Sequence, residues 1–330
     1  MMGRLQQQLH RLDDAQQRHT WSAFPSAVIR KFGDDRAGSL AALIAYYGFF
    51  SLFPLMLVVV TVASFVLHGD EELQLRIVDS ALAQFPVIGS QIRDNVGSIE
   101  GSVAALVVGI GGALWAGMAV LASVQTAMDE VWDVPRRDRA SLFPRLLRGS
   151  VVLVALGAAV LVATLAAGIS ATLGSFAAVV AGSVLAAILN VAVMLIVFRV
   201  LTAAQVSWRD VLPGAVLAGV VWTGLQALGG YIVDSRISGA GNVYGLFAVV
   251  IGLLSWLYLG AQLTLIAAEV NVVLRKRLWP RSFFPPPTSP EDERALTLQA
   301  QQEETLDSEH VSVDFDRGTR SQRVEETRSG

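Results

Sequence analysis

The sequence predicts an all-α membrane protein, a polytopic bundle of six transmembrane helices with an amphipathic segment on the outer face. Of its 330 residues, 53% are hydrophobic and only 16% are charged, which excludes an ordinary soluble domain. About 20 apolar residues cross the hydrocarbon core as a helix, so a fifty-residue run without charge holds two crossings. The five charge-free runs are residues 37–67, 101–128, 149–198, 211–233 and 237–268. Because the third run is long enough for two crossings, the five runs give six spans.

The membrane domain is expected over residues 37–281. A Gly-Ser pair at Gly174 and Ser175 suits a tight turn and divides the third run into two helices. The last run has 32 residues and would extend about 48 Å as one helix, against a core about 30 Å thick. Its glycine-rich start, residues 237–245, is therefore expected to be irregular or re-entrant. The predicted spans are about 40–67, 101–128, 149–172, 176–198, 211–233 and 246–268.

Basic residues in the connections predict that both termini are cytoplasmic, because cytoplasmic loops retain positive charge during insertion. With the N-terminus inside, the inner segments hold seventeen Lys and Arg residues and the outer segments hold three. Residues 1–36 then form a cytoplasmic N-terminal segment, too charged for a signal peptide. The outer segment 68–100 alternates apolar and charged residues and is expected to lie on the headgroups or over the outer mouth of the bundle.

Residues 282–330 are predicted to form a disordered acidic cytoplasmic tail. The stretch from Ser282 to Pro290 contains four prolines, and residues 291–330 carry eleven acidic and five basic residues with almost no aromatics. Such a composition cannot bury enough apolar surface to fold alone. The tail either docks a cytoplasmic partner or is simply solvated.

Polar residues inside the spans are the candidates for a substrate or translocation path, since such groups are costly in a membrane. In the first span these are Tyr46, Ser51 and Pro54, where the proline produces either a structural kink or a broken helix that lines a cavity. Asn190 in the fourth span is able to hydrogen-bond across helices.

The last run contributes three further candidates. Asn242 and Tyr244 lie in its irregular start, which is tolerated at membrane depth only where it is buried in protein or faces water, and they are assigned to a substrate-facing loop. Glu269 closes the predicted helix. It is either a carboxylate at headgroup level, paired with Arg199 or a nearby base, or a proton-responsive cytoplasmic gate.

Five motifs along the chain are distinctive: Ala41-Ala-Leu-Ile-Ala-Tyr-Tyr-Gly-Phe-Phe-Ser-Leu-Phe-Pro54, Val211-Leu-Pro-Gly-Ala, Asn242-Val-Tyr-Gly-Leu-Phe, Ser255-Trp-Leu-Tyr258 and Ala267-Ala-Glu-Val-Asn271. Together they resemble the YihY/BrkB family of bacterial inner-membrane proteins over roughly residues 20–280. Ala267 and Leu246 stand where the family pattern has Gly and Ser. The resemblance implies a six-helix protein of the bacterial inner membrane, linked to serum resistance and envelope lipid homeostasis, with a suspected role in transport.

Two function classes follow: a translocator of lipid or another amphiphile, or a membrane scaffold for envelope-assembly partners. No enzymatic activity, cofactor, metal or nucleic acid is expected. The label ribonuclease BN also circulates in the family, but His10, His19, His68 and His310 are too scattered for a metal-dependent nuclease. Membrane lipids are the expected partners, and a second copy of the chain and a cytoplasmic partner for the tail are left open.

Overall fold

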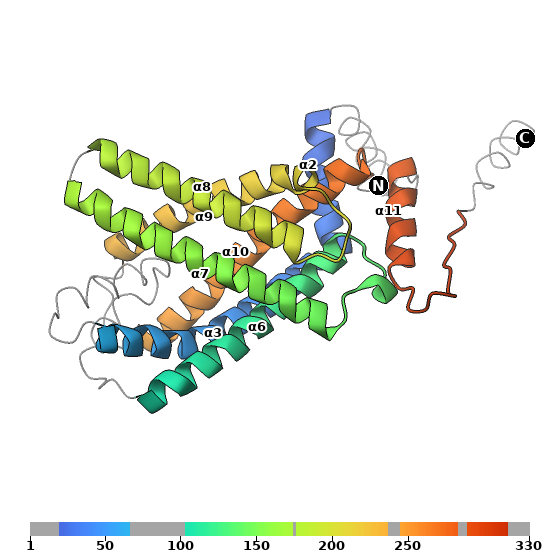
Figure 1. The fold of residues 1–330 in the computed structure, drawn as a ribbon. Helices are drawn as coiled ribbons and strands as arrows, with labels where there is room; N and C mark the ends of the chain where they lie inside the picture. The colour runs from blue at the N-terminus through green and yellow to red at the C-terminus, as the bar shows by residue number, and fades with distance from the viewer. Residues whose placement is uncertain (1–19, 67–102, 174–175, 237–244, 283–288, 316–330) are drawn as a thin grey trace, which may run out of the picture.

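The computed structural model describes residues 20–66, 103–173, 176–236, 245–282 and 289–315, and all regular structure within them is helical. Figure 1 shows six long helices lying side by side, with two shorter ones, α2 (Thr20–Asp34) and α11 (Pro290–Gln301), at one end of the bundle. The long helices are α3 (Ala37–Val66), α6 (Val103–Val131), α7 (Leu142–Leu173), α8 (Phe176–Val200), α9 (Trp208–Arg236) and α10 (Gly245–Lys276).

The six long helices run alternately toward and away from the end that carries α2 and α11 (Figure 1). Five of them contain a segment long and apolar enough to cross a membrane; α9 is not among these. α9 nevertheless has 29 residues and packs between α8 and α10. The segments that qualify within the described residues are Ala37–Leu55, Val107–Val131, Leu142–Ala163, Val180–Val200 and Val250–Lys276.

The outer surface of the bundle is apolar, as expected for a protein whose solvent is lipid. Large hydrophobic side chains on α6 and α7 are mostly exposed, among them Trp115 at 78% and Leu142 at 81%. A soluble monomer rarely exposes a contiguous apolar surface of this kind. The membrane assignment thus follows from the surface as well as from helix length.

Close helix approach depends on glycine at the crossing of α9 and α10. A Cβ added at Gly214 would lie 2.1 Å from the carbonyl oxygen of Ala267 on α10. The same close approach allows the Gly214 amide to donate to Oδ1 of Asn271 at 2.6 Å. The small residue at this position is therefore a packing requirement.

We expect Gly214→Ala to lower the free energy of unfolding by about 1–3 kcal/mol, because a side chain there forces α9 away from α10. Gly224→Ala on the same helix is the matched control, since nothing lies within 4 Å of its added Cβ. The control should be neutral or stabilising, because alanine is the better helix former. Thermal melting of both variants in detergent checks this; equal melting temperatures would contradict it.

The last helix is longer than the sequence predicts. α10 continues from Gly245 to Lys276, whereas the predicted span ends at residue 268. Asn271 and Lys276, which look like residues beyond a span, have buried partners on neighbouring segments, so the helix is held for two more turns. Glu269 therefore lies inside the helix. The predicted irregular start up to residue 244 and the amphipathic segment 68–100 lie outside the described residues.

The predicted disorder of the tail from residue 282 is wrong for residues 289–315. Ser289 caps α11 through a capping box with Asp292, whose side chain is fully buried. Asp292 Oδ1 accepts a hydrogen bond from Arg281 Nε at 3.0 Å, and Oδ2 accepts one from the Ser282 amide at 3.0 Å. Composition excluded independent folding, but this segment folds against the membrane domain through the buried charge of Asp292 together with apolar contacts of Ala295 and Leu298.

The chain beyond α11 binds the connection between α6 and α7. The amides of Arg136 and Arg137 donate to the carbonyl oxygens of Gln302 and Glu304 at 3.1 and 3.0 Å. Arg137 also pairs with the Glu304 carboxylate at 2.8 Å. The acidic tail thus neutralises basic residues of the chain's own connecting segment.

Candidate functional site

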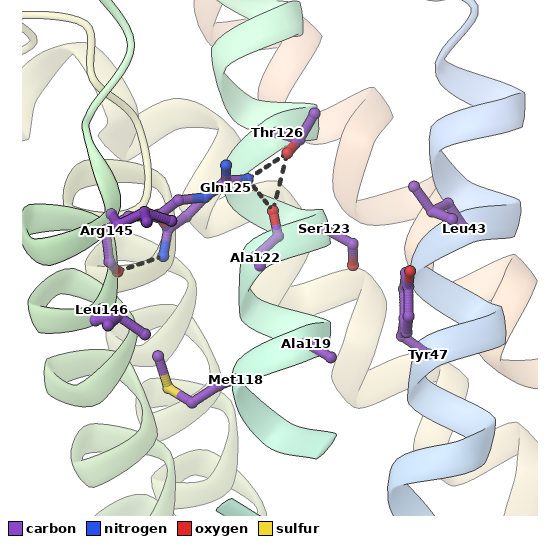
Figure 2. A pocket seen from close by; sticks show the side chains of 11 residues that line it. Leu43, Tyr47, Met118, Ala119, Ala122, Ser123, Gln125, Thr126, Arg145 and Leu146 are labelled. Atoms are coloured by element: carbon purple, nitrogen blue, oxygen red, sulfur yellow. Dashed lines mark hydrogen bonds between the residues drawn. The ribbon is translucent and has the colours of Figure 1, made fainter. Parts of the chain in front are cut away.

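A groove with a volume of about 410 Å³ lies between α3, α6 and α7. In Figure 2, α6 forms its floor, with Tyr47 of α3 on one side and Arg145 of α7 on the other. Apolar side chains make up most of the lining, and Arg145 is its one charged residue. The lining residues are Leu43, Tyr47, Met118, Ala119, Ala122, Ser123, Gln125, Thr126, Leu142, Arg145 and Leu146.

Arg145 is held against the floor of the groove. Its Nη2 donates to the Ala122 carbonyl oxygen at 2.6 Å and to the Thr126 hydroxyl, and Gln125 Nε2 donates to the Arg145 carbonyl oxygen at 3.0 Å. Its buried Nε has no hydrogen-bond partner, and no carboxylate forms an ion pair with Arg145 among the described residues. The guanidinium is therefore a fixed cation without an ion pair, and Asp129 is a carboxylate that acts on it over a longer distance.

The arrangement suits an amphiphile with an anionic headgroup. A guanidinium binds phosphate or carboxylate oxygens through charge-assisted hydrogen bonds, and the apolar walls of the groove suit an acyl chain. The opposite side carries Tyr47, which is about one third exposed. The groove therefore presents a cation at one edge and apolar surface over most of its length.

A second pocket, of about 640 Å³, lies where α7 and α8 meet the connection from α8 to α9. Arg148 and Arg199 line it; Arg148 Nη1 donates to the Thr202 carbonyl oxygen at 3.3 Å, and the Arg199 guanidinium lies 5.9 Å from the Trp208 ring centroid. The connection is fixed by Asp129, whose Oδ1 accepts from the Ala203 amide at 2.6 Å. Arg148 follows Arg145 by less than one turn of α7, so both cavities are basic at the same end.

Five charged side chains come together where α2 and α10 meet the end of α6, and we call them the charge cluster: Lys31, Asp35, Asp133, Glu269 and Lys276. Asp133 accepts from both lysines, from Lys31 Nζ at 3.0 Å and from Lys276 Nζ at 2.8 Å. Lys31 also pairs with Asp35. The ion pairs tie segments 102 residues apart in the sequence.

Burial and neighbouring charges together shift the pKa values of the cluster residues that lie outside the membrane spans, Lys31 and Asp35. Burial alone would lower the pKa of Lys31, but the acidic side chains of Glu269, Asp133 and Asp35 together outweigh it and raise that pKa. Burial raises the pKa of Asp35 to about 6, although the Lys31 ammonium opposes the shift. Asp35 therefore titrates close to neutral pH while Lys31 stays charged.

The residues predicted on the first span lie away from the groove. Tyr46 is 54% exposed, with its ring 4.8 Å from that of Phe50. Ser51 donates to the Gly48 carbonyl oxygen at 2.7 Å within α3. Pro54 lies inside α3, which continues to Val66 as a helix, so the described residues contain no break at the proline.

The other predicted residues are also dispersed. Asn190 on α8 donates to the Thr223 hydroxyl of α9 at 2.9 Å and to Gln226 at 3.3 Å, as expected for an interhelical hydrogen bond. Glu269 is fully buried in the charge cluster, without an ion pair to Arg199 among the described residues. Asn242 and Tyr244 lie outside the described residues.

The groove's main polar residues were not among the predicted site residues. Arg145 counted only as one of the seventeen basic residues of the inner segments. The signal that could have found Arg145 is its position, since the helix that contains it begins three residues earlier, at Leu142. An arginine within a membrane-spanning helix almost always faces the bundle interior or a water-filled cavity, and Arg145 lies within such a segment, Leu142–Ala163.

Comparison with protein families assigns this chain to a family. A family model described as virulence factor BrkB matches residues 28–289, which is most of the chain. The chain belongs to the virulence factor BrkB family. The match covers α3 to α10 and ends at residue 289, just before α11, so the groove and the charge cluster both lie within the family's common domain.

Curated relatives of this BrkB-family chain carry membrane-protein and ribonuclease-like names. YfkH of Bacillus subtilis, named a ribonuclease-like protein, is 28% identical over 269 residues, covering 77% of this chain and 96% of YfkH. A UPF0761 membrane protein of Pseudomonas paraeruginosa is 28% identical over 80% of this chain and 66% of its own length. One of Stenotrophomonas maltophilia is 25% identical over 79% and 62%. The chain thus spans about two thirds of the UPF0761 relatives. No solved structure matches.

Proposed function

We propose that this BrkB-family protein moves an anionic amphiphile, of the phospholipid class, between the leaflets of the membrane, and that the α3–α6–α7 groove receives it on the cytoplasmic side. The observation that carries the proposal is an arginine that is fixed at the edge of an apolar groove, with a buried Nε that has no hydrogen-bond partner. The anionic headgroup requires a cation and the acyl chain requires an apolar surface, and this groove offers both.

The proposed topology has six spans, with α9 as the crossing between α8 and α10, both termini in the cytoplasm and the protein in the bacterial inner membrane. α2 and α11 lie at the same end of the bundle, in support of an even number of crossings (Figure 1). That end also carries the basic connection between α6 and α7, as the positive-inside rule requires for a cytoplasmic face.

Reporter fusions test this topology. Alkaline phosphatase fused after Arg281 should be inactive, because a cytoplasmic site is reducing, and the same reporter fused near Asp79 should be active. The two fusions are each other's control, since both must be present at equal levels in the membrane fraction. An active fusion after Arg281 would contradict a cytoplasmic C-terminus.

The alternative scaffold function has less support. It requires the acidic tail to recruit cytoplasmic partners, but residues 289–304 are engaged with the chain itself through Arg281, Arg136 and Arg137. Partner recruitment would first have to break buried pairs, which is costly. The described part of the tail therefore acts as an internal clamp.

We also propose that the chain is not a nuclease, in spite of the ribonuclease-like name of YfkH. Metal-dependent hydrolysis needs a group of ligands held at a shared centre. Among the described residues, no group of three or more His, Cys, Asp or Glu side chains could hold a metal ion. The carboxylates of the charge cluster are instead paired with lysines.

Reconstitution tests the proposed function. The full chain is placed in liposomes with a fluorescent phosphatidylglycerol, and the outer leaflet is bleached by a reductant that does not cross the membrane. We expect bleaching to exceed the outer-leaflet fraction only in liposomes that contain the protein. Bleaching equal to that of protein-free liposomes, with the protein inserted and folded, would contradict translocation.

A further inference from the structure

We propose that the charge cluster is a proton-binding site, in which the carboxyl groups of Asp35 and Glu269 share one exchangeable proton whose release weakens the contact between α2 and α10. This inference is independent of the proposed function. It rests on the balance of charge in the cluster, on the absence of a partner for Glu269 and on the elements that the cluster joins.

The charge balance requires one proton. The cluster has three carboxyl groups and two ammonium groups, and four of the five side chains are buried. If all five were ionised, a net negative charge would remain inside the protein, and burying an uncompensated charge is strongly unfavourable. One bound proton makes the cluster neutral without any rearrangement.

Geometry identifies Glu269 and Asp35 as the two carboxyl groups that share this proton. Asp133 accepts from both lysines, and Asp35 is paired with Lys31. Both carboxyl oxygens of Glu269 are buried and lack a hydrogen-bond partner among the described residues, although the residue is wholly inside the protein. Asp35 is the carboxyl group that interacts with it, so the two form the pair that shares the proton.

Other charged groups on the surrounding elements face elsewhere. On α2, Asp34 pairs with Arg281 at 2.8 Å. On α6, Asp129 accepts from the Ala203 amide. On α9, Asp210 pairs with Arg275 of α10, and the first turns of α3 carry no charge. Lys31, Asp133 and Lys276 are therefore the charged groups that act on the pair.

The position of the pair gives its proton a structural consequence. Asp35 follows α2 and precedes α3, whereas Glu269 belongs to α10, which contacts both helices as well as α6 and α9. Loss of the proton leaves two adjacent carboxylates across this junction. Their repulsion opposes the packing of α10 against α2, so the junction is tightest when the pair is protonated.

The sign of the pH dependence follows. Burial raises the pKa of Asp35, the member of the pair outside the membrane spans, above its value in the unfolded chain, so the folded state binds more protons than the unfolded state over this pH range. The stability that the pair contributes is then fully present at a pH near the carboxyl pKa values of the unfolded chain. It is lost as the pH rises through the range in which the folded pair releases its proton. One proton corresponds to at most a tenfold increase in the unfolding equilibrium constant per pH unit.

Melting of the full chain in detergent from about pH 5 to about pH 8 tests the proposal, a window that lies above the ordinary carboxyl pKa values. We expect the unfolding equilibrium constant of the wild type to rise by up to tenfold per pH unit relative to that of Glu269→Gln, because glutamine imitates the protonated acid. Asp35→Asn should remove the same component. Glu303→Gln, whose side chain is 62% exposed, is the control and should keep the wild-type slope.

Three results would overturn the proposal. The first is a wild-type slope in Glu269→Gln or in Asp35→Asn. The second is a Glu269→Gln protein less stable than wild type at the upper end of the pH range, as an ionised Glu269 paired with Lys31 would produce. If either variant fails to fold, the infrared carbonyl band of a protonated carboxylic acid in the wild type decides: its absence at neutral pH contradicts a bound proton.

Discussion

Asp292→Ala is expected to lower the free energy of unfolding by up to about 3–5 kcal/mol, because it breaks the buried ion pair with Arg281 and leaves that arginine with Asp34 as its remaining anion. Arg281 is among the largest fully buried side chains, and Asp292 accepts from its Nε at 3.0 Å. Arg30 lies 3.6 Å from the same carboxylate oxygen. Loss of this carboxylate therefore affects α2, the end of α10 and α11 together.

Thermal melting in detergent and limited proteolysis of the tail measure this effect. The control is Glu303→Ala, which removes the exposed pair with Arg136 and should cost less than about 1 kcal/mol. A melting temperature of Asp292→Ala equal to that of the control would show that the tail does not stabilise the membrane domain.

The same carboxylate makes the packing of α11 sensitive to low pH. Burial would raise the pKa of Asp292, but hydrogen bonds from the Ser282 and Ser289 amides and from Arg281 outweigh it, so the pKa lies below its usual value. A depressed carboxyl pKa contributes stability above the unfolded value of about 3.9, and this stability is lost as the pH falls below it. Acid should therefore release α11.

Arg145→Gln is expected to slow the movement of phosphatidylglycerol in liposomes by about tenfold or more, since a hydrogen bond to a charged group contributes about 1.5–3 kcal/mol. Movement of zwitterionic phosphatidylcholine should change much less. The ratio of the two rates is the measurement, because a merely structural loss would lower both rates together.

Arg145→Lys separates charge from fold in this experiment. Lysine keeps the positive charge but not the planar fork that reaches Ala122 and Thr126, so it should retain the preference for anionic lipid at reduced overall rate. An unchanged lipid ratio in Arg145→Gln, with a normal melting temperature, would show that Arg145 does not bind the headgroup.

The long helices were predictable because a membrane imposes a simple rule on sequence. Charge-free runs of sufficient length predicted α3, α6, α7 and α8. α7 ends at Leu173 and α8 begins at Phe176, on either side of the Gly-Ser pair. α10 ended later than predicted, since the partners that bury Lys276 come from a distant segment. Local hydropathy contains no information about such partners.

The site was less accessible to sequence reasoning because it depends on pairs that are distant in the chain. Lys31 and Asp133 each look like ordinary cytoplasmic charges, yet they form a buried ion pair across 102 positions. Glu269 was selected because it was polar near a span, and its interpretation as a proton-responsive group stays a prediction. Arg145 served only as evidence for the orientation of the chain in the membrane. Its position in the groove depends on the carbonyl oxygen of Ala122, which belongs to another helix.

The central claim is that the amphiphile passes along the α3–α6–α7 groove, and blocking the groove tests it most directly. Ala119→Trp places a large side chain among the lining residues, whereas Val154→Trp adds the same side chain to an exposed position of α7. The measurement is the initial rate of phosphatidylglycerol movement in liposomes with equal amounts of each folded variant. The account predicts a rate near that of protein-free liposomes for Ala119→Trp and a wild-type rate for Val154→Trp; equal rates for the two variants would contradict it.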